Sequence, residues 1–418
     1  MVTEKDTEAP PFITKFEVAG CADGRLLAAS PMRPYPRKIS RIGGAVLDRY
    51  PAARRVSAGD MVEVRSKAEI LASLDERGRL DGMPFMPEMF QYCGQRFPVY
   101  KRAHKTCDTV SGNYRGLALD DGVHLDLRCD GRAHGGCQAA CLLFWKEAWL
   151  RPVASVFSAS SECTSAPAAG KAPRYGAACT EQAVLRAAIH PDAGSEQRFS
   201  CQATELLSFT KPLPRWDPRH YAEDYFSGNV SLSKMLQVFS YSAYMLFTRA
   251  CSNRWGQPGR WLYDRIQSVW GGLPFPRYRG RIPLGVCTPR TDLGLQPGDW
   301  VRVKSYGQIL ATLNTANANR NLGFDAELVP YCDRVFQVRA QVTKFIDEPT
   351  GRLKVMKTPA VILEGAFCRS WYSPKRIGCP RSIYAWWREI WLERVAAPSD
   401  RADSAPLNKN ASRLGAVM

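Results

Sequence analysis

Residues 93–141 concentrate the side chains that bind metal ions or act as nucleophiles. They make up 49 of the 418 residues but contain five of the 14 cysteines and three of the five histidines. These are Cys93, Cys107, Cys129, Cys137 and Cys141, together with His104, His124 and His134. Thiolate and imidazole groups are the ligands that Zn²⁺ prefers, usually four of them in a tetrahedron. The enrichment therefore favours a chemical role for this part of the chain.

The segment 128–141, RCDGRAHGGCQAAC, has the composition of a tight loop that carries metal ligands. Its glycines permit sharp turns, so thiolates on both sides of the loop can converge. We expect a zinc site, with an iron–sulfur cluster on cysteines as the less favoured form of metal binding. The segment lacks the paired Cys-x-x-Cys motifs typical of zinc sites. The candidate ligands are Cys93, Cys129, His134, Cys137 and Cys141.

Two other interpretations of these residues stay open. Cys137 follows His134 and two glycines, where we expect a helix to begin. A helix N-terminus lowers the pKa of a thiol and offers free N–H groups, and Asp130 would orient the histidine. Cys137, His134 and Asp130 are therefore candidate catalytic residues. Alternatively the cysteines pack in the core, because free cysteine is among the most buried residue types.

The elements that must position these residues occur twice in the sequence. Residues 59–66, GDMVEVRS, match residues 298–305, GDWVRVKS, and further identities follow in the same register. The ending WKEAWL at 145–150 matches WREIWL at 387–392. Such a series of matches predicts two copies of one module. The second copy provides a weaker set of candidate ligands: Cys332, Cys368 and Cys379.

Each copy has the pattern of a small β-rich fold. Apolar and polar residues alternate in the opening GDxVxVxS segment, as in a half-buried strand. The phrase PGDWVRVKS at 297–305 resembles the first strand of SH3-like or KOW-like barrels. That resemblance implies a small β-barrel in each copy. The repeated Trp-rich ending predicts an amphipathic helix that closes each barrel.

We expect an α+β protein in which a helical insert separates the two barrel-like modules. Asp217-Pro218 is typical of a helix start, and residues 231–250 carry an apolar stripe at helical spacing. The expected parts are an N-terminal segment 1–55, a first module 56–153, an Ala/Ser-rich linker 154–180, a mainly helical insert 181–290, a second module 291–395 and a disordered tail 396–418.

Basic residues outnumber acidic ones. The chain has 57 Lys and Arg against 40 Asp and Glu, a formal net charge of +17. Such an excess attracts an anionic polymer or an acidic protein partner, although dispersed surface arginines without a partner are the alternative. Arginines alternate with aromatic residues at 254–281, a composition suited to gripping phosphate groups. The candidate anion-binding residues are Arg277, Arg279 and Arg281.

Several activities find no support in the sequence. It contains no GxxxxGK[ST] loop, no GxSxG motif and no HExxH motif, and no apolar run approaches the about 20 residues that span a bilayer. The N-terminus lacks an apolar signal segment, so we expect a cytoplasmic protein. The leading hypothesis is a metal-binding accessory or adaptor protein whose basic surface engages an anionic partner. The alternatives are a thiol- or metal-dependent enzyme and a nucleic-acid-binding protein.

Overall fold

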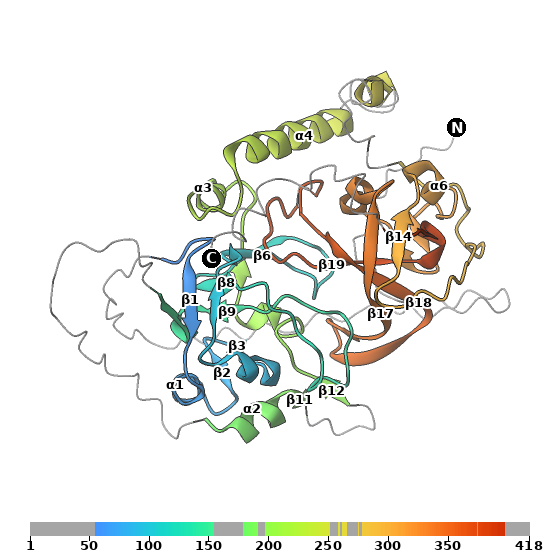
Figure 1. The fold of residues 1–418 in the computed structure, drawn as a ribbon. Coiled ribbons are helices and arrows are strands. Elements are labelled where there is room, and N and C mark those ends of the chain that lie inside the picture. Colours follow the sequence, from blue (N-terminus) through green and yellow to red (C-terminus); the bar gives the residue numbers. More distant parts are fainter. Residues whose placement is uncertain are drawn as a thin grey trace, which may run out of the picture.

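The computed structural model describes the two copies almost completely (Figure 1). The described residues are 55–153, 179–190, 197–250, 258–259, 261–265, 275, 278–373 and 375–397. Nearly all of the expected N-terminal segment, linker and tail therefore lies outside them.

Short helices and several small, separate sheets make up the first copy, which is a mixed α/β structure. Its elements are β1 (Met61–Val64), α1 (Lys67–Ser73), β2 (Arg79–Leu80), β3 (Met83–Pro84), the 3₁₀ helix η1 (Pro87–Tyr92), β4 (Arg96–Pro98), β5 (Lys101–Arg102), β6 (Lys105–Cys107), β7 (Gly116–Ala118), β8 (Gly122–His124), β9 (Trp145–Lys146), η2 (Glu147–Trp149) and β10 (Leu150–Pro152). Strand β1 lies between β10 and β4 in an antiparallel sheet. Its alternate residues Val62 and Val64 are fully buried, as the alternating pattern predicts.

The second copy repeats these elements in the same order, with two much longer strands. Its elements are β14 (Trp300–Val303), α6 (Tyr306–Leu310), β15 (Ala318–Asn319), β16 (Leu322–Gly323), η4 (Ala326–Tyr331), β17 (Val335–Asp347), β18 (Arg352–Phe367), β19 (Tyr384–Trp387), η5 (Glu389–Trp391) and β20 (Leu392–Arg394). Val301 pairs with Phe336 across β14 and β17, just as Val62 pairs with Phe97 across β1 and β4. This recurrence of order and register supports the proposed duplication.

The same capping arrangement starts the first helix of each copy. Ser66 accepts a hydrogen bond from Glu69 N–H, and the Glu69 side chain accepts one from Ser66 N–H. Ser305 and Gln308 do the same for α6. Two backbone N–H groups at each helix start are thereby satisfied, which favours a helix that begins directly after the repeated GDxVxVxS segment.

The prediction of two closed barrels is wrong. In the described part of the chain no sheet closes on itself; β1 has only β4 and β10 as neighbours, and β5, β8 and β9 form a separate sheet. Many strands of the first copy are two or three residues long. A barrel needs an unbroken ladder around its circumference, which such short strands separated by turns do not supply. Alternation in the sequence identified strands but not how they join.

The predicted closing helix is also wrong. Trp145 lies in β9 and Trp149 in the single 3₁₀ turn η2, after which β10 returns to β1. Trp387 and Trp391 occupy the same places in the second copy, and all four rings are fully buried. A strand, one 3₁₀ turn and a strand place residues four apart on the same buried side. Residues four apart also share one side of a helix, which is why the Trp-rich ending predicted a helix.

The insert contributes strands as well as helices, which corrects the expectation of a mainly helical unit. Its elements are α2 (Glu181–Ala187), β11 (Ile189–His190), β12 (Arg198–Phe199), η3 (Leu206–Ser208), β13 (Lys211–Pro212), α3 (Arg219–Phe226) and α4 (Leu232–Ala250). Strand β12 pairs with β18 of the second copy, and β13 pairs with β7 of the first. The insert therefore joins the two copies. Helix α3 begins one residue after Pro218, where the Asp217 carboxylate accepts the Arg219 N–H at 3.1 Å.

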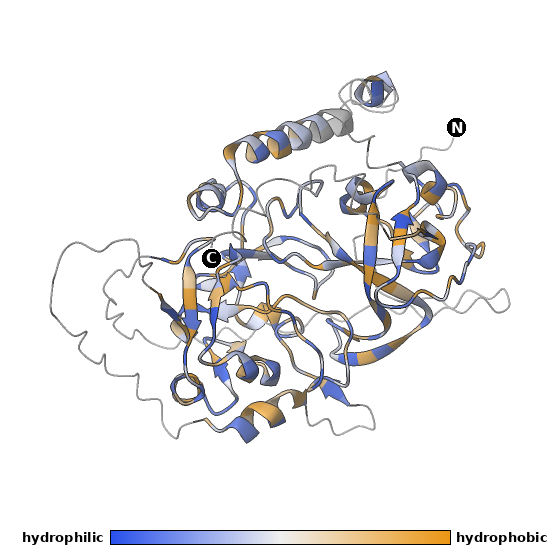
Figure 2. Ribbon diagram, in the orientation of Figure 1, coloured by the Kyte–Doolittle hydropathy of each residue, from blue (hydrophilic) through white to orange (hydrophobic). Residues whose placement is uncertain are grey.

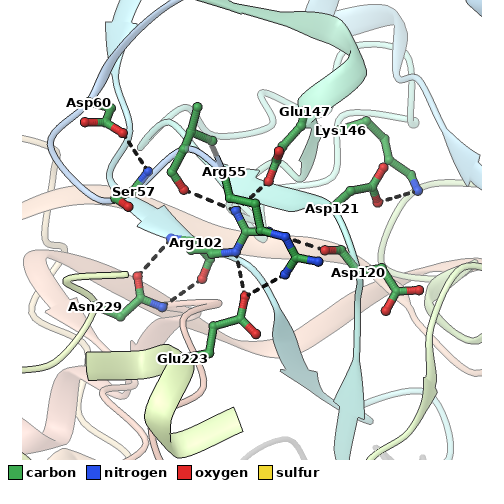
Figure 3. A network of polar contacts seen from close by, with 11 residues as sticks. Arg55, Ser57, Asp60, Arg102, Asp120, Asp121, Lys146, Glu147, Glu223 and Asn229 are labelled. Carbon is green, nitrogen blue, oxygen red and sulfur yellow. Dashed lines mark hydrogen bonds and ion pairs between the residues drawn. The ribbon is translucent and has the colours of Figure 1, made fainter. Parts of the chain in front are cut away.

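A buried arginine fastens α3 to the first copy (Figure 3). Arg102 is 2% exposed and its guanidinium contacts the carboxylates of Glu147 and Glu223. Asn229 completes the contact by exchanging two hydrogen bonds of 2.8 Å with the Arg102 backbone. Because the charge and the backbone groups are both paired, this polar contact is compatible with burial.

Each copy has its own hydrophobic core. One core surrounds Trp145 and Trp149, and the other surrounds Trp387 and Trp391. Strands β17 and β18 carry both hydrophobic and hydrophilic residues (Figure 2), and the apolar run 360–363 of β18 is buried in the second core. The loop that carries the cysteines lies between the cores: Cys129 and Cys141 pack on the first, and Cys137 packs on the second.

Candidate metal centre

The segment 128–141 folds into a closed loop. At its base, Cys129 N–H donates to the carbonyl oxygen of Cys141 at 2.9 Å. Gly131 has a φ of +69°, and a Cβ there would lie 2.1 Å from the carbonyl oxygen of Cys137. Only glycine permits this approach. The loop therefore turns as its glycines predict, and it brings its cysteines to one end.

Glu88, Cys129 and His134 converge at this loop. Each offers one ligand atom, and the three atoms lie within 4.8 Å of one another. Glu88 comes from η1, whereas the other two come from the loop. No other three His, Cys, Asp or Glu residues meet this distance in the described part of the chain. Carboxylate, thiolate and imidazole are all ligands of Zn²⁺ and of other transition metals.

Contacts on both sides of the ring orient His134. Its Nε2 lies 3.1 Å from the carbonyl oxygen of Ser200, so Nε2 carries a proton and donates it. Its Nδ1 lies 2.7 Å from Oε1 of Glu88. Metal-binding histidines commonly donate their second ring N–H to a backbone carbonyl in this way. Nδ1 is therefore the atom that can bind a metal ion after losing its proton.

Glu88 is a buried carboxylate with one oxygen that lacks a partner. Oε1 accepts hydrogen bonds from Ala133 N–H at 3.1 Å and from His134. Oε2 is buried and has no hydrogen-bond partner in the described structure. Burial opposes the charged form of Glu88, but the hydrogen bond and charge of His134 outweigh burial and lower its pKa. A buried, ionised oxygen without a partner is costly, and a bound cation would satisfy it.

Beside this group lies a cavity of about 30 Å³ whose wall is rich in thiols. Cys129, Cys137, Cys141 and Cys201 line it, together with His134. Burial raises the pKa of each of these four thiols, and that of Cys201 to about 11. Without a metal they are therefore neutral thiols at physiological pH. The cavity is larger than those beside Cys379, about 10 Å³, and beside Lys105, about 20 Å³.

The structure brings four of the five predicted ligands together. Cys129, His134, Cys137 and Cys141 line the cavity, but Cys93 does not. Cys93 is half-buried and follows the last residue of η1. Its charged neighbours there are Lys67 and Glu181.

Two residues of the centre were missed from the sequence. For Glu88 the available signal was its recurrence as Glu327 at the equivalent position of the second copy. Cys201 follows the loop by 60 residues, in the insert, and nothing in the local sequence connects it to the other cysteines.

The second predicted set is only partly assembled. Cys368 and Cys379 line a cavity with Cys107 of the first copy, whereas Cys332 lies at the end of η4. Glu327 occupies the place of Glu88 and accepts hydrogen bonds from Trp371 N–H and Tyr372 N–H. The anchoring carboxylate is thus kept in the second copy without a histidine beside it.

The candidate catalytic residues do not form a triad. Asp130 accepts the Arg132 N–H at 3.0 Å and pairs with the Arg132 side chain at 3.3 Å, whereas His134 contacts Glu88. Residues 137–141 are not helical, so no helix N-terminus acts on Cys137. Burial instead raises its pKa. These features oppose an activated thiolate at this position.

Among the candidate anion-binding residues, Arg279 and Arg281 are exposed, and Arg277 lies outside the described residues. No helix of the described chain has the length and hydrophobicity needed to cross a membrane. Ten of the described cysteines are free thiols, and Cys287 is disulfide-bonded.

No protein-family model matches this chain, and no curated protein is similar to it in sequence.

Proposed function

We propose that this protein binds a metal centre in the cavity beside the 128–141 loop, with Cys129 as a ligand. The observation that carries the proposal is the convergence of Glu88, Cys129 and His134 within 4.8 Å, with the buried Oε2 of Glu88 left unsatisfied. A single ion held by these three groups would be zinc by ligand preference. Ser200 would then hold the histidine in the tautomer that binds metal.

The accessory or adaptor role follows from what surrounds the site. The thiols are buried and neutral, and the predicted triad is not assembled, which disfavours the thiol enzyme. The net charge of +17 supports an anionic partner, and the exposed Arg279 and Arg281 would contribute to such a surface. The ten free thiols support a cytoplasmic location.

The test is the metal content of the full-length protein, purified without oxygen and without chelators. We expect bound metal in the wild-type protein and its loss in C129S. The matched control is C368S, which replaces the equivalent buried thiol of the second copy and should keep the metal. A wild-type protein that holds no metal and takes up neither zinc nor iron would overturn the proposal, because the convergence would then be only a buried Glu88–His134 ion pair.

A further inference from the structure

The four thiols around the cavity come from two separate parts of the chain. Cys129, Cys137 and Cys141 belong to the loop of the first copy, and Cys201 belongs to the insert after β12. His134 ties the two parts together, since its Nε2 donates to the carbonyl of Ser200, next to Cys201. A core packed only for stability has no need to collect four thiols from such distant segments around one open space, because protein interiors are closely filled.

One of these sulfur atoms also contacts the second copy directly. The Cys137 sulfur accepts a hydrogen bond from Ile346 N–H at 3.4 Å, and Ile346 lies in β17. The cavity therefore lies where the loop of the first copy, the insert and a strand of the second copy meet.

A metal bound to the sulfurs replaces their protons and neutralises their charge, so it gives four buried sulfur atoms around one space a common partner.

The sulfurs are not gathered as tightly as they are around a single ion. Around a tetrahedral zinc with Zn–S bonds of about 2.3 Å, the sulfur atoms lie about 3.8 Å apart. In the described structure no three of the four sulfurs lie within 4.8 Å of one another, as the ligand atoms of Glu88, Cys129 and His134 do. In an iron–sulfur cluster the thiolates are shared among several iron atoms, so they stand around a larger body. The four cysteines line one cavity in this way.

Charged side chains on the wall are also in place. Arg381 lines the cavity, is 2% exposed, and is held by Thr109 at 2.6 Å and by Glu348 at 3.2 Å. A cluster with four thiolates is an anion, and a fixed guanidinium near it offers a stabilising charge.

From these observations we infer that the cavity holds an iron–sulfur cluster ligated by Cys129, Cys137, Cys141 and Cys201. The inference rests on the proposed metal-binding function and names its cofactor. It reverses the preference for zinc drawn from the sequence, since Cys201 and the sulfur spacing were not visible there. The second copy lacks this centre, because Ile383 stands in place of Cys141 and no insert follows it.

The experiment measures iron, zinc and acid-labile sulfide in the full-length protein purified without oxygen, together with its visible absorption. We expect iron and sulfide in similar amounts, a thiolate-to-iron absorption band, and an electron paramagnetic resonance signal in one of the two redox states. X-ray absorption at the iron edge of the wild-type protein should show both sulfur and iron neighbours. This last measurement needs no variant, so it tests the cluster even if a variant fails to fold.

Variants then identify the ligands. C129S, C137S, C141S and C201S should each lose the absorption band and most of the iron. C93S and C332S are controls, since both cysteines follow 3₁₀ helices and neither lines the cavity.

One zinc per chain without sulfide, lost in E88Q and H134A but kept in C201S, would overturn the cluster while leaving the metal-binding function intact. A protein that binds no metal, even after incubation with iron and sulfide under reducing conditions, would overturn both.

Discussion

Glu88 and Glu327 occupy equivalent positions in the two copies, and both use a buried carboxylate to hold the loop that follows. Glu88 accepts the N–H of Ala133, and Glu327 accepts those of Trp371 and Tyr372. The two differ in their partners. Glu88 faces the imidazole of His134, whereas the second copy places the permanently charged Arg376 near Glu327. The same scaffold thus carries a group able to bind metal in one copy and a fixed cation in the other.

Gly131 is predicted to be essential to the loop. In G131A the new Cβ would lie 2.1 Å from the carbonyl oxygen of Cys137, so the loop must open and the metal content should fall sharply. G112A is the matched control, because Gly112 has a similar φ of +68° but no atom within 4 Å of its Cβ position. The control should cost only about 1 kcal/mol of backbone strain. Metal analysis measures the metal content of both variants, and thermal unfolding measures their stability. Equal metal loss in G131A and G112A would contradict the prediction.

The tryptophans at the end of each copy are predicted to hold the two cores. Trp149 and Trp391 are both fully buried, so W149A and W391A should each destabilise the fold by about 3–5 kcal/mol. Denaturant unfolding of the purified variants measures this cost.

Conservative replacements separate the two sites. Trp391 Nε1 donates to Thr312 Oγ1 at 3.0 Å, whereas Trp149 Nε1 has no partner in the described structure. W391F should therefore cost about 1 kcal/mol more than W149F. The reverse order would show that the hydrogen bond contributes nothing.

Lys105 and Asp224 form a buried ion pair that joins β6 to α3, with their side chains 4% and 3% exposed. Removing one partner leaves the other charge buried alone, so D224N should cost about 3–5 kcal/mol. K211M is the control, because Lys211 pairs with Asp120 at the surface with 76% of each side chain exposed. It should change the free energy of unfolding by less than about 1 kcal/mol. A D224N variant as stable as K211M would refute the structural role of the pair.

His220 is predicted to make stability depend on pH. Burial and the nearby Lys105 charge lower its pKa to about 4, below the ordinary value of 6.5, although Asp224 acts in the opposite direction. Between pH 4 and pH 6.5, His220 therefore binds a proton in the unfolded chain but not in the folded chain. This contribution to stability is complete above pH 6.5 and is lost as the pH falls towards 4. His124, with a pKa lowered to about 3 by burial, acts in the same direction.

H220Q should thus flatten the fall in stability between pH 6.5 and 4, leaving the part due to His124. Urea unfolding across that pH range measures it. An unchanged slope in H220Q would mean that His220 titrates alike in both states.

Local patterns were sufficient for the features that short segments specify alone. The valines of the GDxVxVxS segments alternate into the cores as predicted, Gly131 turns the cysteine loop, and the capping pairs at Ser66 and Ser305 start their helices. Each depends on contacts between residues a few positions apart. For the same reason the loop itself, with Cys129, His134, Cys137 and Cys141, was identifiable in advance.

Tertiary structure alone decided how these pieces join. The spacing of Trp145 and Trp149 suits a helix, but it also suits a strand followed by one 3₁₀ turn. The chain adopts the strand and turn because β10, which follows them, pairs with β1. Apolar and polar residues alternate along a strand in an open sheet and in a barrel alike. The pattern therefore did not reveal that the hydrogen-bonded ladders end before a barrel closes. Glu88 from η1 meets the loop through its hydrogen bonds to Ala133 and His134, and Cys201 comes from the insert, whose strand β12 pairs with β18. A metal centre depends on such distances between remote segments, and spacing along the chain does not encode them.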